Sequence, residues 1–98
     1  MIDPFSIPSS PTATLLLAAR PRPDNSIAIQ NQGTATIYIA YDGSQNVTVA
    51  GGARPGIAIQ PGATLFLGVG NEDRMTMANA IYGVQMSGTT QAGTILRT

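Results

Sequence analysis

Residues 27–43 read IAIQNQGTATIYIAYDG, and two runs of alternating side chains meet in this stretch at Gly33. Successive side chains of a β-strand point to opposite faces, so the isoleucines of each run share one face of a strand. A glycine between two such runs is typical of the turn in a β-hairpin. The stretch therefore predicts two antiparallel strands, at residues 26–31 and 35–41.

The rest of the chain repeats this pattern of short β-type runs separated by turns. Ile, Val and Thr, whose branched side chains favour strands, make up 25 of the 98 residues. Pairs such as Asp42-Gly43 and Pro61-Gly62 mark the turns. This organisation predicts an all-β fold, a small antiparallel β-sandwich of jelly-roll-like type. The further strands that we expect are 46–50, 56–60, 63–69, 80–87 and 93–97.

Four stripes of apolar side chains are expected to form the core of this sandwich. A chain of this length buries only about 60–70% of its unfolded surface, so the core is thin. Small folds of this kind are often stabilised by association. The expected stripes are Ile27 and Ile29; Ile37, Ile39 and Tyr41; Leu65, Leu67 and Val69; and Tyr82, Val84 and Met86.

Residues 1–25 differ from the remainder because they contain five of the seven prolines. Proline fixes φ and lacks a backbone donor, so we expect extended backbone here rather than a helix. The segment is nevertheless too apolar for a solvated linker, and ATLLLAA at 13–19 is expected to form a strand. We therefore divide the chain into an extended, Pro-rich N-terminal arm, 1–25, and a β-sandwich domain, 26–98.

The composition argues against several classes of function. The chain has no Cys, His or Lys, and its five Arg and five acidic residues give a formal net charge of zero. It thus lacks a base for a Ser or Thr nucleophile and the usual zinc ligands, so we expect no enzyme, no cofactor and no metal. Scattered, balanced charges argue against nucleic acid. The apolar run at 13–19 is too short to span a bilayer, and Asp3 stands where a signal peptide would carry Lys or Arg, so we expect no membrane partner and synthesis in the cytoplasm.

Three local features remain open as binding sites. Residues 71–73, Asn-Glu-Asp, carry oxygen ligands that Ca²⁺ accepts, although a solvated loop tip is the simpler interpretation. The glycine-rich run AGGARPG at 50–56 presents Arg54 for contact with a partner. Aromatic rings stack on sugars when they are exposed, but packing in the core and at its rim is the simpler interpretation for Tyr38, Tyr41, Phe66 and Tyr82.

Three segments, SIAIQNQGTATIYIAYD, GIAIQPGATLFLGV and AIYGVQMSGTTQAGTILR, make up most of the run from Ser26 to Arg97. They resemble the opening hairpin, the Pro-Gly hairpin and the closing strands of small β-sandwich proteins from tailed bacteriophage virions. Such proteins serve as capsid cement or decoration proteins, or as parts of head fibres and tail appendages. The resemblance implies a structural virion protein.

The resulting hypothesis is a cement or decoration protein on the surface of the phage head, where it stabilises the capsid. It is expected to associate with itself as a dimer or trimer and to bind across subunits of the major capsid protein. The arm would add to a neighbour as an extended strand, with apolar anchors beside it. The expected partner-binding residues are Ile2, Phe5, Ile7, Leu15, Leu16, Leu17 and Arg54.

Two alternatives stay open. The first is a head-fibre or tail-associated module that binds host glycan, which the tyrosines and the short loops favour. The second is a head–tail connector or another tail component, which differs from a cement protein mainly in its location and its number of copies.

Overall fold

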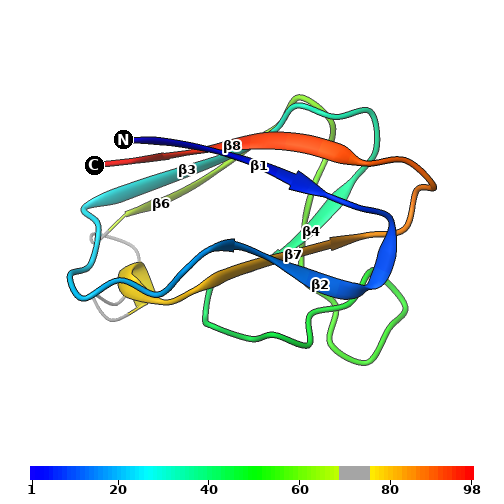
Figure 1. The fold of residues 1–98 in the computed structure, drawn as a ribbon, viewed down its shortest axis with the longest axis horizontal. Coiled ribbons are helices and arrows are strands. Elements are labelled where there is room, and N and C mark those ends of the chain that lie inside the picture. Colours follow the sequence, from blue (N-terminus) through cyan, green and yellow to red (C-terminus); the bar gives the residue numbers. More distant parts are fainter. Residues whose placement is uncertain (69–75) are drawn as a thin grey trace.

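The computed structural model describes residues 1–68 and 76–98, which form two packed four-stranded sheets (Figure 1). Sheet A has the strand order β1-β8-β3-β6 and sheet B the order β2-β7-β4-β5, with antiparallel pairing throughout. The prediction of a small all-β antiparallel sandwich is confirmed. The elements are β1 (Ile2–Ile7), β2 (Ser10–Leu17), β3 (Ser26–Asn31), β4 (Ile37–Ala40), β5 (Ile57–Ile59), β6 (Thr64–Gly68), the 3₁₀ turn η1 (Thr76–Ala78), β7 (Ile81–Gln85) and β8 (Gln91–Arg97).

The core between the sheets is built mainly from isoleucine. Alternation along each strand sends every second side chain inward, which is why the stripes predicted on β3, β4 and β6 supply core residues. Leu65 and Tyr41 are partly buried and pack against this core. The buried cluster comprises Phe5, Ile7, Ile27, Ile29, Ile37, Ile39, Ile59, Leu67, Met77, Ile81 and Ile95.

The stripe predicted on β7 is confirmed only for Val84, which is 1% exposed. Tyr82 is half-buried, Met86 follows the end of the strand and is 57% exposed, and Ile81 is the β7 residue that joins the core cluster. Gly83 lies on the same face as Ile81, and a Cβ atom at Gly83 would come within 2.7 Å of the Ile7 Cδ1 atom. From the sequence, the face that carries Val84 is the more apolar one. Gly83 has no side chain, so the sequence does not indicate that its face is packed against neighbouring residues.

Residues 1–25 contribute a strand to each sheet, so the prediction of an arm outside the sandwich is wrong. β1 pairs with β8 from Ile2 opposite Leu96 to Ile7 opposite Gln91, and β2 pairs with β7. The backbone is extended, as the prolines predict. β1 and β2 are edge strands, the position in a sheet that tolerates Pro4 and Pro11. An extended apolar segment needs a strand beside it, and the sequence does not reveal that this strand belongs to the same chain.

The predicted strand at 46–50 is also wrong, since these residues lie in a loop, 41–56, that joins β4 to β5. Thr48 forms an isolated parallel bridge with Pro55, and the loop turns at Gly51, whose φ is 88°. The other predicted strands contain or overlap an observed one. The predicted hairpins are wrong, however, because β3 and β4 lie in different sheets, as do β5 and β6, so the turns at Gly33 and Pro61-Gly62 cross from one sheet to the other. Val69 and the acidic run 71–73 lie outside the described residues.

Three buried amide side chains hold the loops at the end of the sandwich opposite the chain termini (Figure 1). Asn31 and Gln85 are 0% exposed and Gln91 is 1% exposed. The Oε1 atom of Gln91 accepts hydrogen bonds from the N–H groups of Thr34 and Ala35, at 2.7 and 3.0 Å. These side chains form hydrogen bonds with backbone N–H and C=O groups where the chain leaves the sheets. Backbone groups in a buried loop require such partners.

Candidate functional site

The seven residues predicted to bind a partner are distributed over several environments. Phe5 and Ile7 are buried in the core of their own chain, so as contact residues for a partner they are a wrong prediction. A bulge in β2 turns the consecutive side chains of Leu16 and Leu17 against the core, where they are half-buried. The remaining three, Ile2, Leu15 and Arg54, are exposed.

Four of the seven charged side chains in the described part pair with one another beside the chain termini. Arg97 Nε lies 2.8 Å from Asp3 Oδ2, and Arg20 Nε lies 3.0 Å from Asp24 Oδ2. Burial lowers the pKa of Arg20, and the neighbouring Asp24 opposes this shift. The guanidinium of Arg20 also donates to the carbonyl of Met77 at 2.6 Å, which ties the segment after β2 to η1. This network serves the fold rather than a ligand, because its charges face one another.

The outer face of sheet A carries an apolar row that crosses all four strands. Ile2 of β1 lies opposite Leu96 of β8, Leu96 opposite Ala28 of β3, and Ala28 opposite Phe66 of β6. Residues directly opposite one another point to the same side of a sheet, so these four side chains form one row. Phe66 is 75% exposed, Ile2 67% and Leu96 47%. A shallow hollow lies over Ala28 between Phe66 and Leu96.

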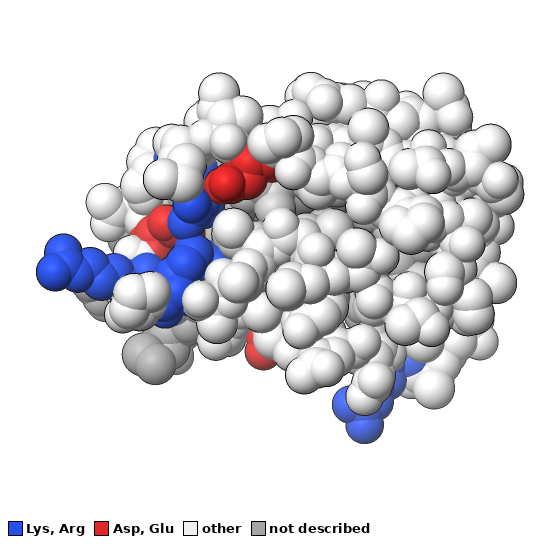
Figure 2. All heavy atoms as spheres, viewed as in Figure 1, with Lys and Arg blue, Asp and Glu red and all other residues white. Residues whose placement is uncertain are grey.

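No charged residue occupies an outward position on the strands of sheet A. The alternation places twelve positions on this face, three on each strand. In Figure 2 the charged side chains gather at the end that holds the termini, and others lie along the lower side. We call these positions the neutral face: Ile2, Pro4, Ser6, Ser26, Ala28, Gln30, Thr64, Phe66, Gly68, Ala92, Thr94 and Leu96.

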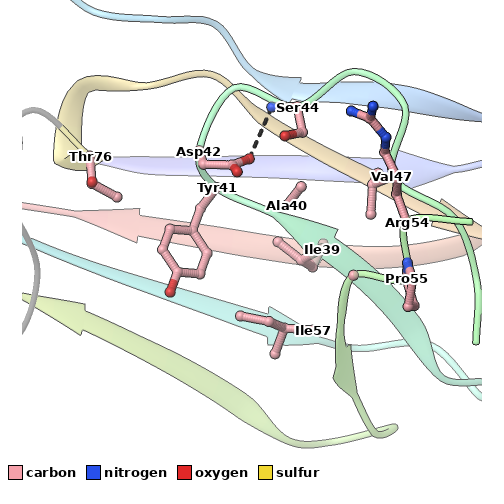
Figure 3. Close-up of a pocket in the computed structure, with 11 residues that line it drawn as sticks. Ile39, Ala40, Tyr41, Asp42, Ser44, Val47, Arg54, Pro55, Ile57 and Thr76 are labelled. Atoms are coloured by element: carbon pink, nitrogen blue, oxygen red, sulfur yellow. Dashed lines mark hydrogen bonds between the residues drawn. The ribbon is translucent and has the colours of Figure 1, made fainter.

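An open pocket of about 420 Å³ lies beside sheet B, between the end of β4, loop 41–56 and the start of β5 (Figure 3). Its apolar part includes Ile39 and Ile57. Its polar part includes Asp42 and Arg54, with Ser44 between them in the view of Figure 3. Among the described residues that line it, the pocket thus combines an apolar wall with one acidic and one basic side chain.

Local hydrogen bonds hold the carboxylate of Asp42 and the backbone of Arg54. The backbone N–H of Ser44 donates to Asp42 Oδ1 at 3.0 Å. Hydrogen bonds from the Ser44 hydroxyl and N–H lower the pKa of Asp42, so the carboxylate is ionised at neutral pH. The N–H of Thr48 donates to the Arg54 carbonyl at 2.8 Å, and the Arg54 N–H donates to the Thr48 hydroxyl at 3.2 Å.

A close approach of the backbone closes the pocket loop. A Cβ atom at Gly56 would lie 2.6 Å from Val47 Cγ2 and 2.8 Å from the Ile39 carbonyl oxygen, so only glycine lets the loop pack against β4 here.

Of the aromatic residues, Tyr41 lines the pocket, whereas Tyr38 and Tyr82 lie on the outer face of sheet B and Phe66 lies on the neutral face. The aromatic set named from the sequence therefore does not form a single patch.

No family model, curated protein or solved structure matches this chain. The resemblance to bacteriophage sandwich proteins therefore rests on the sequences of the three quoted segments, because the two hairpins that it implied are not formed. Among the described residues, no helix is long and apolar enough to cross a lipid bilayer. The neutral face and the pocket are the two surfaces from which a function can be argued.

Proposed function

We propose that this protein is a structural virion protein of a bacteriophage, a capsid decoration protein that docks on the major capsid protein through the neutral face. The observation that supports this is the exposed row from Ile2 to Phe66 on a sheet face without a charged residue. The centres of protein interfaces are depleted of charged residues, and extended apolar patches on small proteins are often contact sites.

The size of the neutral face indicates how such docking works. Four strands spaced about 4.8 Å apart and about six residues long present roughly 400 Å². A standard interface buries about 800 Å² on each partner, so a single contact of this face is weak. Contacts between neighbouring copies on a shell add to it, because a second contact of an already tethered molecule forms at high effective concentration. Self-association as a dimer or trimer on the shell belongs to the same proposal.

The strand order gives further support. β1 pairs with β8, β2 with β7, β3 with β6 and β4 with β5, so the eight strands form nested pairs distributed over two sheets. This is the order of a jelly roll, an architecture found in viral capsid proteins and in lectins. A shared architecture does not fix a function, so this point supports the proposal only together with the neutral face.

We expect Phe66→Asp to abolish docking on capsid shells and to leave the free energy of unfolding within about 0.5 kcal/mol of the wild type, as for other surface substitutions. The aromatic ring is 75% exposed, so its replacement affects a contact surface rather than the core. Co-sedimentation with shells assembled from the major capsid protein measures the docking. Met86→Asp is the matched control, because Met86 is 57% exposed but lies outside the neutral face.

Wild-type protein that fails to co-sediment with shells would contradict docking on the capsid protein. If wild type sediments alone as a dimer that Phe66→Asp dissociates, and shells are not bound, the neutral face is a contact between copies only. The number of copies in purified virions provides a separate check. On the order of hundreds of copies support decoration of the shell, whereas about six or twelve assign the protein to the neck or tail, where symmetric rings are small.

A further inference from the structure

We propose that the pocket between β4, loop 41–56 and β5 binds a neutral polyhydroxylated ligand, such as one sugar unit of a glycan. This inference does not depend on the proposed function, because the pocket belongs to sheet B and the neutral face to sheet A. It also differs from the tyrosine patch considered from the sequence, because a single tyrosine, Tyr41, lines the pocket.

The charges of the pocket define the class of ligand. Outside the ion-pair network, the described chain carries three charged side chains, Arg22, Asp42 and Arg54, and two of them line this one pocket. No ion pair joins Asp42 to Arg54, so each faces the pocket space or solvent. The carboxylate repels a simple anion and the guanidinium repels a simple cation. A neutral ligand that both donates and accepts hydrogen bonds satisfies both groups.

Sugar hydroxyl groups have this property. An ionised carboxylate only accepts hydrogen bonds and a guanidinium only donates them, whereas a hydroxyl does both. The hydroxyls of one sugar therefore supply a donor to Asp42 and an acceptor to Arg54, and each of these hydrogen bonds is charge-assisted. Ser44 and Thr76 place further hydroxyl groups at the pocket, which suit a ligand with several neutral polar groups better than a zwitterion.

The remaining walls of the pocket suit the apolar face of a sugar ring. Ile39, Ile57 and Tyr41 line it, and aliphatic or aromatic surface packs against the C–H groups of a pyranose. The volume of about 420 Å³ lies at the lower end of the range of about 300–1,000 Å³ that ligand pockets span, which fits a mono- or disaccharide. The hydrogen bond from Ser44 holds the Asp42 carboxylate in place, which lowers the ordering entropy that binding costs at this group.

Titrations of the full chain followed by ¹H–¹⁵N NMR test the inference. The probes are glucose, galactose, N-acetylglucosamine and rhamnose as neutral sugars, glycine as a zwitterion, and sodium phosphate as an anion. We expect at least one sugar to give saturable shifts confined to residues 39–44 and 54–57, with Kd on the order of millimolar, as for a small ligand with few contacts.

Variants then test the two charged groups. Asp42→Asn keeps an oxygen that accepts from the Ser44 N–H but removes the charge, and Arg54→Ala removes the donor. Each is expected to weaken sugar binding about tenfold or more, since a charge-assisted hydrogen bond is roughly twice as strong as a neutral one. Arg22→Ala is the matched control, because Arg22 is exposed and does not line the pocket. Thermal unfolding of each variant confirms that the fold is intact.

The possible results are decisive. Saturable sugar shifts that Asp42→Asn and Arg54→Ala reduce, and Arg22→Ala does not, support the proposal. Saturation by glycine alone or phosphate alone, an absence of shifts with every sugar at 100 mM, which is about a hundred times a millimolar Kd, or shifts at other residues would each overturn it. A loss of capsid docking in Phe66→Asp has no bearing on this outcome, so the two proposals fail separately.

Discussion

Replacement of Phe5 by alanine is expected to lower the free energy of unfolding by about 3–5 kcal/mol, the usual cost of truncating a buried aromatic side chain. Phe5 is 7% exposed and belongs to the core cluster. Its partner across the two strands is Gly93 of β8, and the ring occupies the space where a side chain at Gly93 would lie. The substitution removes the ring and leaves the Gly93 backbone without its cover. Urea denaturation monitored by circular dichroism measures the change.

Ile2→Ala is the matched control in the same strand. Ile2 is 67% exposed on the neutral face, so we expect a change below about 1 kcal/mol, as for surface substitutions. The comparison also tests the place of residues 1–25. If this segment were an arm that folds only on a partner, both variants would have the stability of the wild type. A loss below 1 kcal/mol for Phe5→Ala would therefore contradict the pairing of β1 with β8.

The contact between Phe5 and Gly93 shows why alternation predicts strands better than it predicts their partners. The runs at 26–31 and 35–41 carry their own signal, because apolar and small or polar side chains alternate within each. The pairing of β1 with β8 joins residues at opposite ends of the chain. A glycine opposite an aromatic residue gives no signal in a single sequence, so the sequence leaves open whether residues 1–25 pack on their own domain or on a neighbour.

The candidate surfaces were predictable only in part. In the sequence, a glycine-rich loop presents Arg54, and the structure places this residue at a pocket. The sequence predicts a turn at Asp42 and a strand at 46–50. The contribution of Asp42 to the pocket depends on the actual path of loop 41–56, which contains no such strand. The neutral face depends on register. Ile2, Leu96 and Phe66 come from three separate strands, and only the pairing aligns them.

The buried amides had no counterpart in the sequence analysis, since the sequence presents Asn31 as the polar end of a strand. The structure shows it fully buried, with hydrogen bonds to three backbone groups. Its Nδ2 donates to the carbonyls of Ala35 at 2.8 Å and Ile59 at 2.9 Å, and its Oδ1 accepts from the Gly33 N–H at 2.9 Å. One side chain thus connects the turn after β3 with the end of β5.

We expect Asn31→Leu to lower the free energy of unfolding by about 2–4 kcal/mol, because it leaves one buried and two partly buried backbone groups without partners, and a fully buried group costs about 1–3 kcal/mol. The side chain is similar in size, so the loss reports on hydrogen bonds more than on a cavity. Urea denaturation measures it. Asn46→Leu is the matched control: the same change at an exposed position of loop 41–56 is expected to stay within about 0.5 kcal/mol.

Asn31→Asp separates hydrogen bonding from packing, because the two side chains have nearly the same shape. An ionised carboxylate does not donate to the carbonyls of Ala35 and Ile59, and burial among acceptors raises its pKa in the folded state. A group whose pKa is raised on folding binds protons more readily in the native state, so stability falls as the pH rises. Asn31→Asp should therefore be less stable relative to wild type at pH 7 than at pH 4. An absence of loss at both pH values would show that the amide at position 31 acts through shape alone, and equal losses at both would contradict the raised pKa.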